Sequence, residues 1–504
     1  MRQEIALALA FFAFASVAGA DVDALYQEHC AECHGTERLG GVGPALIPEA
    51  LGRMRGPKIV DVILNGRESS EMIGFGDQIS PEQAEALAAY LKTPLEVVPD
   101  WSVDEIDATR VVNEDYAPVD APVFAADPLN LILIEEMADH SFSIVDGDSF
   151  EVIHRFEAPY AVHGSPKFSA DGRFVYVMSR DGWVQKFDIW GLDEVVRVRA
   201  GFNSRNIALS HDGKWLAVAN YLPNTLSILS AEDLSAAIVH EIKGKDGSPS
   251  RVSAVYTVPP RESFVLALKD VPETWEVFYG ENPPFYGFVH DYKVEGPPEE
   301  RVPFPRRRMM VGGVIDDFFF DPSFEYAMGA KAGGDGGAVV DLVIGHKIAD
   351  LDLPGLPRLG SAVAMEFQGR DVIVTPHLRA DTFSVVDMES WQTVKRIATE
   401  GPGFFMRDHA GSPYLWGDVF FGPNKDKVHV LDRETLEIVK TLQPVPGAAL
   451  GHVEFTRDGK YALVSVWEED GAVIVYDANS LEEVRRLEMR KPLGKYNVGN
   501  KIGH

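Results

Sequence analysis

The sequence of 504 residues contains only two cysteines, Cys30 and Cys33, which lie in one short motif. A scaffold held by several disulfides is therefore excluded. Basic residues are also scarce, because 47 Lys and Arg stand against 77 Asp and Glu and leave a net charge of −30. Such a chain repels nucleic acid, so we expect no nucleic-acid partner. An acidic surface instead suits a soluble protein that meets a basic redox partner.

Long hydrophobic runs are missing after the N-terminus. The apolar stretch from Ile5 to Val17 is too short for a comfortable membrane span, and Ala18-Gly19-Ala20 follows it as a small-residue cleavage signal. We interpret residues 1–20 as a signal peptide, the alternative being a short membrane anchor. No later stretch of 18 apolar residues exists. We therefore predict a periplasmic protein without a membrane span.

The two cysteines form the motif Cys30-Ala31-Glu32-Cys33-His34. Two thiols at this spacing attach haem covalently, and the adjacent His34 is placed to ligate its iron. A redox pair or a structural disulfide is the alternative. It is disfavoured because an amphipathic segment precedes the motif, no βαβ pattern surrounds it, and a helix-like segment at 81–91 closes the region. We predict one covalent haem c.

The second axial ligand of that iron is predicted to be a methionine. Met72 lies in a loop before the segment 81–91, and Met54 is its rival, although a single methionine is more often part of a core. The stretch resembles a class I cytochrome c, in which a loop methionine before the last helix ligates the iron. Met72 matches that position, with Ile73 where a proline is usual. The predicted domain covers residues 21–95, and a linker covers 96–114.

The rest of the chain is a repeat. An apolar strand ending in Asp recurs at Asp146, Asp188, Asp341, Asp387, Asp432 and Asp477, with Ser230 as a variant. The one long interval has room for a further unit near 289–291, which brings the number of units to eight. Asp-Gly turns precede several units. A period in the forties with several strands per unit is typical of a β-propeller. We predict an all-β eight-bladed propeller over residues 115–504, following a small all-α cytochrome c domain.

Two segments of the repeat carry a family resemblance. One runs from His163 to Gly182, and the other is Pro492-Leu493-Gly494-Lys495-Tyr496-Asn497-Val498. With the haem c motif, they resemble the cytochrome cd1 family, which contains nitrite reductases and dihydro-haem d1 dehydrogenases. The resemblance implies that His163 ligates the iron of haem d1 and that Arg180 and Arg205 hold the carboxylates of the macrocycle. Guanidinium groups suit that role in a strongly acidic protein.

The same resemblance separates the two activities. The nitrite reductases carry two histidines that protonate nitrite, and the matching regions here, 309–314 and 356–360, contain none. The dehydrogenases instead have a histidine in Gly-His-x-Glu-Phe and a tyrosine in Gly-Lys-Tyr-Asn. These are matched by His452 and Tyr496. Cleavage of an N–O bond consumes protons, so the missing donors argue against nitrite reduction.

Arg358 marks a departure from the dehydrogenases, which usually have a distal iron ligand in a Pro-His-Leu-Gly segment at this place. A guanidinium cannot ligate iron, but it can pair with a carboxylate of the macrocycle. His377 is an alternative distal ligand. The departure favours an alternative function, that of a carrier that transfers haem d1 to nitrite reductase.

The resemblance implies an oxidoreductase that binds haem d1 or its dihydro precursor and converts a propionate side chain into an acrylate. The sequence predicts His452 as the base and Tyr496 as the group that orients or shares the proton. Electrons are expected to leave one at a time through haem c to a periplasmic acceptor. The alternatives are the carrier and, below it, a nitrite reductase.

Overall fold

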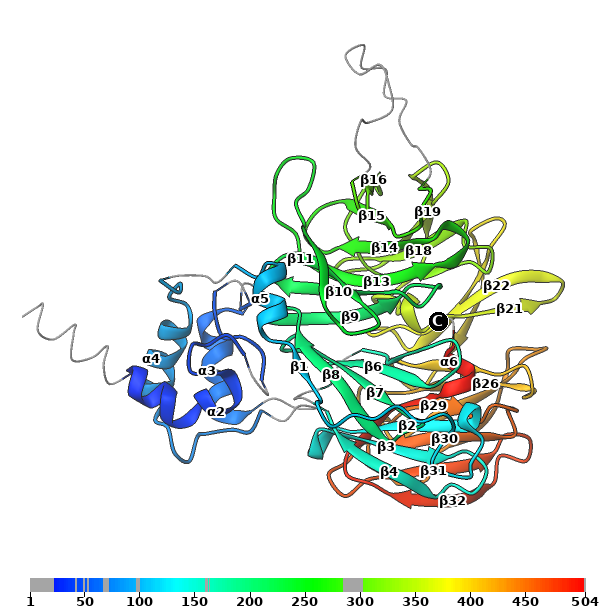
Figure 1. The fold of residues 1–504 in the computed structure, drawn as a ribbon. Coiled ribbons are helices and arrows are strands. Elements are labelled where there is room, and N and C mark those ends of the chain that lie inside the picture. Colours follow the sequence, from blue (N-terminus) through cyan, green and yellow to red (C-terminus); the bar gives the residue numbers. More distant parts are fainter. Residues whose placement is uncertain are drawn as a thin grey trace, which may run out of the picture.

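The computed structural model describes residues 22–40, 43–48, 50–51, 54–66, 72–96, 100–158, 162, 164–283 and 302–502. A small helical unit lies beside a much larger β unit (Figure 1). This arrangement confirms the predicted fold class. The predicted signal peptide lies outside the described residues. Among those described, no helix has the length and apolar character needed to cross a membrane.

The helical unit contains the haem c motif. Its helices are residues 22–29, α2 (Ala31–His34), α3 (Gly56–Asn65) and α4 (Pro81–Leu91). Helix α4 has the bounds predicted from sequence, because Ser80 caps it: the Ser80 hydroxyl accepts from the Gln83 N–H and the Gln83 side chain accepts from the Ser80 N–H. Tyr26 and Leu87 are fully buried in the core that the helices share.

The predicted linker leads from the helical unit to the propeller, and its described part from residue 100 to 114 contains two short elements. Helix α5 (Val103–Ala108) is capped by Ser102, and β1 (Val111–Val112) adds to the edge of one propeller sheet. The remaining short helices are η1 (Pro128–Asn130), η2 (Met137–Asp139), η3 (Pro259–Arg261), η4 (Leu359–Ser361) and α6 (Val498–Lys501).

The β unit is built from groups of four antiparallel strands. The first three blades, each from the inner to the outer strand, are β33 (Pro492–Asn497), β2 (Leu131–Glu136), β3 (Ser141–Asp146) and β4 (Val152–Glu157); β5 (Lys167–Phe168), β6 (Phe174–Met178), β7 (Trp183–Asp188) and β8 (Asp193–Arg199); and β9 (Asn203–Leu209), β10 (Trp215–Leu222), β11 (Thr225–Ser230) and β12 (Ala236–Glu241). The next two are β13 (Val252–Val258), β14 (Ser263–Leu268), β15 (Glu273–Phe278) and β16 (Arg306–Met310); and β17 (Ile315–Phe320), β18 (Tyr326–Lys331), β19 (Gly337–Asp341) and β20 (His346–Leu351). The last three are β21 (Val363–Phe367), β22 (Arg370–Thr375), β23 (Thr382–Asp387) and β24 (Thr393–Ala398); β25 (Met406–Asp408), β26 (Tyr414–Asp418), β27 (Val428–Asp432) and β28 (Ile438–Leu442); and β29 (Leu450–Phe455), β30 (Tyr461–Val466), β31 (Ala472–Asp477) and β32 (Glu483–Glu488).

The predicted eight blades are confirmed within the described residues. The ring closes because β33, from the C-terminus, pairs with β2, with Leu133 opposite Tyr496. A single parallel bridge from Met310 to His346 joins two of the blades into one sheet of eight strands. The unit marker predicted at 289–291 lies outside the described residues, and the third strand of that blade is β15.

The sequence signals of the repeat are turn contacts. An aspartate that ends the third strand of a blade accepts backbone N–H groups from the turn that follows, as Asp387 does from Ser390 at 2.7 Å. The Asp-Gly turns join the first strand to the second. Gly172, Gly213 and Gly459 each adopt φ 72° there, which favours glycine.

Alternation of strand direction sorts the loops onto two faces of the ring. Connections between blades and between second and third strands share one face, which we call the long-loop face. Arg180 lies between β6 and β7, Arg358 lies before β21, and Arg205 and His452 lie near the starts of inner strands. The topology therefore places residues predicted from distant parts of the chain on one face.

Candidate functional site

His34 is held in the orientation that a haem ligand needs. It ends α2, is 7% exposed, and its Nδ1 donates to the carbonyl of Pro44 at 2.8 Å. Burial lowers the pKa of its imidazole. Nδ1 is thus committed to the backbone, and Nε2 is the atom available to iron. A side chain at Gly43 would put its Cβ 2.5 Å from the His34 ring, so only glycine leaves this space free.

The two thiols and the predicted methionine suit the same group. Cys30 is half-buried, Cys33 is exposed, and neither forms a disulfide. Met72 lies in the loop before α4, and the neighbouring Phe75 ring is 6.0 Å from the His29 ring next to the motif. Met54 packs against the helical core. The residues present therefore fit a covalent haem c, and the choice of Met72 remains a prediction.

The loop that follows the haem c motif packs directly on the propeller. Ala45 and Ile47 are buried with Phe202 and Leu222, and the Trp101 ring lies 4.4 Å from the Phe202 ring. Arg199 ties the two units together, since its guanidinium donates to the Leu39 carbonyl at 3.1 Å and to the Asp181 carbonyl at 2.9 Å. The cytochrome domain thus docks beside the loop that carries Arg180.

The predicted haem d1 residues begin at that loop. The Ser204 N–H donates to the Arg180 carbonyl at 2.9 Å, which places Arg180 next to Arg205. His163 lies outside the described residues. Its neighbour Val162 bridges to Ser179, and a Cβ on Gly164 would lie 3.2 Å from the Arg205 carbonyl. The structure therefore brings the backbones of Arg180 and Arg205 together.

A basic cluster surrounds the ring of Tyr221. The cationic groups of Arg205, Arg251 and Lys269 lie 4.7, 5.1 and 5.6 Å from its centroid. Arg251 pairs with Asp270 and Lys269 with Asp316. Three cations around one aromatic ring suit the carboxylates of a macrocycle. Sequence reasoning missed Arg251 and Lys269, although Lys269 directly follows the second strand of its blade, much as Arg180 does.

Arg358 is paired within the protein. Its guanidinium bonds to Asp317 and lies 4.9 Å from the centroid of the Phe404 ring. Asp317 also accepts from the Gly360 N–H at 2.7 Å and the Tyr256 hydroxyl at 3.4 Å. The buried Nε of Arg358 has no hydrogen-bond partner among the described residues. Arg358 therefore keeps donor capacity toward an anionic ligand.

His452 and Tyr496 are brought into contact, with ring centroids 5.2 Å apart. The His452 ring also meets Phe405 at 4.7 Å, and Phe405 packs on Phe404 at 4.4 Å. A chain of contacts thus runs from Arg358 through the two phenylalanines to His452 and Tyr496. The structure assembles three separately predicted residues along one side of the long-loop face.

Asp418 holds the backbone of this chain of contacts in place. Sequence reasoning did not identify it. It is fully buried and accepts from the backbone N–H groups of Phe404 at 2.7 Å, Phe405 at 3.0 Å and His452 at 3.4 Å. Burial raises its pKa to about 7. One carboxyl group therefore positions both the aromatic pair and His452.

His377, the alternative distal ligand, is packed into its blade. It is fully buried, and its Nε2 lies 2.8 Å from the Ser384 hydroxyl. Burial lowers its pKa to about 4. Its Nε2 is thereby engaged with Ser384, and His377 as the distal ligand stays a prediction.

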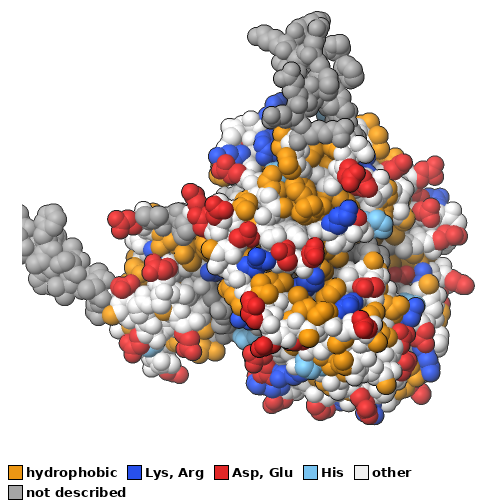
Figure 2. Space-filling view, in the orientation of Figure 1, with side chains coloured by type: hydrophobic (Ala, Val, Ile, Leu, Met, Phe, Trp, Pro, Cys, Tyr) orange, Lys and Arg blue, Asp and Glu red, His pale blue; other side chains and the backbone are white. Residues whose placement is uncertain are grey.

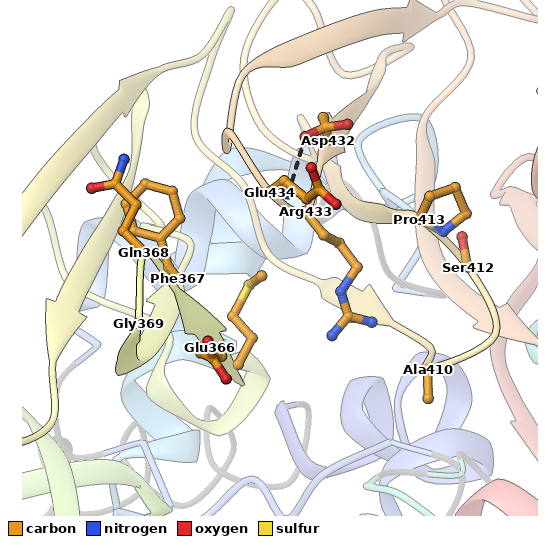
Figure 3. Close-up of a pocket in the computed structure, with 11 residues that line it drawn as sticks. Glu366, Phe367, Gln368, Gly369, Ala410, Ser412, Pro413, Asp432, Arg433 and Glu434 are labelled. Carbon is orange, nitrogen blue, oxygen red and sulfur yellow. Dashed lines mark hydrogen bonds between the residues drawn. The ribbon is translucent and has the colours of Figure 1, made fainter.

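A cavity of about 630 Å³ opens on the opposite face (Figure 3). It lies among the β21–β22 turn, the β25–β26 connection and the β27–β28 turn. Arg433 in its wall is already bound to the His409 carbonyl at 2.8 Å and to Asp408 at 3.1 Å. This cavity is therefore separate from the residues described above.

Comparison with known proteins decides the family. The model described as "Cytochrome D1 heme domain" matches residues 126–501, three-quarters of the chain. The chain belongs to this family. Residues 17–91 match the model described as "Cytochrome C oxidase, cbb3-type, subunit III", which agrees with a cytochrome c domain.

Two relatives differ in their sequence identity to this chain. The dihydro-heme d1 dehydrogenase of Pseudomonas aeruginosa is 48% identical over 501 residues, covering 99% of this chain and 98% of that protein. A nitrite reductase of Stutzerimonas stutzeri is 24% identical over 94% of this chain and 92% of its own length. The resemblance to the dehydrogenases rather than to the reductases is thereby confirmed.

A solved structure shares this fold. It is the dihydro-heme d1 dehydrogenase NirN in complex with DHE, with a TM-score of 0.84 and 48% identity, covering 95% of this chain and 99% of that one. The propeller of the cytochrome d1 family and the haem c domain are therefore both present here.

Proposed function

We propose that this protein is a dihydro-haem d1 dehydrogenase of haem d1 biosynthesis. The observation that carries the proposal is the chain of contacts that links Arg358, through Phe404 and Phe405, to His452 and Tyr496. The same face carries the Tyr221 basic cluster. The 48% identity to a dehydrogenase over nearly the whole chain supports the same activity. The absence of histidines at 309–314 and 356–360 disfavours nitrite reduction.

The substrate is a macrocycle with several carboxylates. We assign their binding to Arg180, to the cluster of Arg205, Arg251 and Lys269, and to Arg358. Each is a donor on the long-loop face, and charge-assisted bonds are the strong ones in a water-poor site. The remaining propionate then lies toward His452 and Tyr496.

The reaction removes two electrons and two protons from a CH2–CH2 unit and leaves CH=CH. Haem c, when bound, supplies a one-electron acceptor, so two turnovers of its iron are needed for each substrate. The loop that accepts from His34 at the Pro44 carbonyl continues into Ala45 and Ile47, which pack on Phe202 of the propeller. The electrons pass to an external one-electron carrier, and a basic carrier suits the acidic surface, on which Asp and Glu are spread over both units (Figure 2).

The test is anaerobic incubation of the haem c-loaded protein with dihydro-haem d1 and a one-electron oxidant. Dehydrogenation gives a product lighter by two hydrogens and a shifted visible spectrum. A variant with Cys30→Ser and Cys33→Ser is the control that lacks covalent haem. A protein that binds dihydro-haem d1 unchanged and passes it to nitrite reductase is a carrier, and that result would refute the proposal.

We place the mature protein in the periplasm, because residues 1–20 have the pattern of a signal peptide and covalent attachment of haem c suits an exported protein. Export of a fusion carrying residues 1–30 tests this placement.

A further inference from the structure

His452 is buried and has a backbone conformation that is unusual for a histidine. It lies in β29, is 3% exposed, and adopts φ 52°, a backbone conformation that is rare for residues other than glycine. The β29–β30 pairing is irregular between Gly451 and Glu454, so the chain bulges at this point. Such a bulge re-aims a side chain, here into the space beside Phe405 and Tyr496.

One nitrogen of the ring is already used. The backbone N–H of Lys495 donates to Nδ1 of His452 at 3.1 Å. A backbone N–H can only donate, so Nδ1 carries the lone pair and no proton. The proton of the neutral ring is therefore on Nε2, which has no hydrogen bond to a described residue.

The surroundings disfavour a second proton on this ring. Burial lowers the pKa of His452 well below its ordinary value, and Lys495, Arg407 and Lys501 lower it further. Acids also face this region. Asp418 accepts from the backbone N–H of His452, and Glu454 is paired with Lys501 at 3.0 Å. These acids are bonded to backbone N–H groups and to a lysine, and among the described residues neither accepts a proton from the His452 ring.

We propose that His452 serves the dehydrogenation as an Nε2–H donor to the substrate carboxylate rather than as the base predicted from sequence. This inference rests on the proposed function and deepens it. When the carbon next to a carboxylate loses its proton, negative charge spreads onto the carboxylate oxygens. A fixed donor stabilises that charge without rearrangement. That proton passes to solvent water. The adjacent carbon then loses its hydrogen as a proton and two electrons, and the electrons pass one at a time to the one-electron oxidant, so that CH2–CH2 becomes CH=CH.

The assignment can be tested by substitutions that separate donation from proton uptake. A glutamine amide can donate near the position of Nε2 but cannot act as a base. We expect His452→Gln to keep at least about a tenth of the wild-type kcat and His452→Ala to lose about a hundredfold, consistent with the loss of one oxyanion donor. The matched control is His211→Gln, an exposed histidine on the opposite face, which leaves kcat unchanged.

A second measurement does not depend on activity or on the stability of a variant. In wild-type protein labelled with 15N-histidine, we expect His452 to show the Nε2–H tautomer, with Nδ1 unprotonated, from pH 6 to 8. A protonated Nδ1, or equal inactivity of folded His452→Gln and His452→Ala, would overturn the inference. A wild-type protein that converts no dihydro-haem d1 would instead refute the proposed function and leave the tautomer result interpretable.

Discussion

The pair formed by Arg358 and Asp317 permits a quantitative prediction. The two side chains are 28% and 15% exposed. A hydrogen bond between charged partners contributes about 1.5–3 kcal/mol, and partial exposure favours the lower half of that range. We therefore expect Arg358→Ala to destabilise the propeller by about 2 kcal/mol.

We expect Arg358→Ala to weaken the affinity for dihydro-haem d1 as well. Without Arg358, Asp317 keeps its bonds from the Gly360 N–H and the Tyr256 hydroxyl, and it stays on the long-loop face as an uncompensated negative charge. If the variant loses one charge-assisted hydrogen bond to the substrate, the binding free energy weakens by about 2 kcal/mol. This corresponds to a roughly thirtyfold weaker affinity for dihydro-haem d1. Titration of the visible spectrum measures this affinity, and thermal unfolding measures the stability.

The double variant Arg358→Ala with Asp317→Ala separates the two effects, because it removes the unpaired carboxylate and should recover part of both losses. The matched control is Arg457→Ala, which breaks an exposed pair with Asp127 whose side chains are 48% and 43% exposed. Exposed pairs contribute at most about 1 kcal/mol. If Arg358→Ala weakens binding no more than Arg457→Ala does, Arg358 does not take part in holding the substrate.

Three further predictions concern haem c and a buried acid. Cys30→Ser or Cys33→Ser should abolish or sharply reduce the covalent haem stain in a denaturing gel, and a full stain would contradict the motif assignment. Met72→His should retain the haem but lower its reduction potential, because imidazole favours ferric iron more than a thioether does; the same drop in Met54→His alone would assign the other methionine. Burial raises the pKa of Asp181 from 3.8 to about 6, so the folded state keeps this proton at pH values where the unfolded chain has lost it. The stability of the wild type relative to Asp181→Asn should therefore fall by on the order of 2–3 kcal/mol as the pH rises from 4 to 6, and chemical unfolding that shows a constant difference would contradict this cause.

Several features could be predicted from sequence because their causes are local. The haem c motif consists of five consecutive residues, and α4 follows directly after its capping residue Ser80. The blade period is visible because most third strands end in a residue that closes its own turn, as Asp387 and Asp477 do. Interactions between residues a few positions apart leave a recognisable pattern in the sequence. The recurrence of that pattern therefore predicted eight blades.

Irregular parts of the same repeat could not be located in this way. The sequence marker for the fourth blade was placed at 289–291, whereas the third strand of that blade is β15 and ends at Phe278. That strand ends at a phenylalanine, with neither the aspartate found in six other blades nor the serine of β11, so the local signal is missing. Only the pairing of β15 with β14 and β16 identifies it.

The chemistry of the site depended on tertiary structure. From sequence, His452 is an imidazole that could give or take a proton, and Arg358 is a cation in a loop. The structure places the Lys495 N–H against Nδ1 of His452, 43 residues away along the chain, and Asp317 against Arg358, 41 residues away. Sequence determined which groups are present, and closure of the ring of blades decided their partners, because protonation and charge depend on neighbours in space.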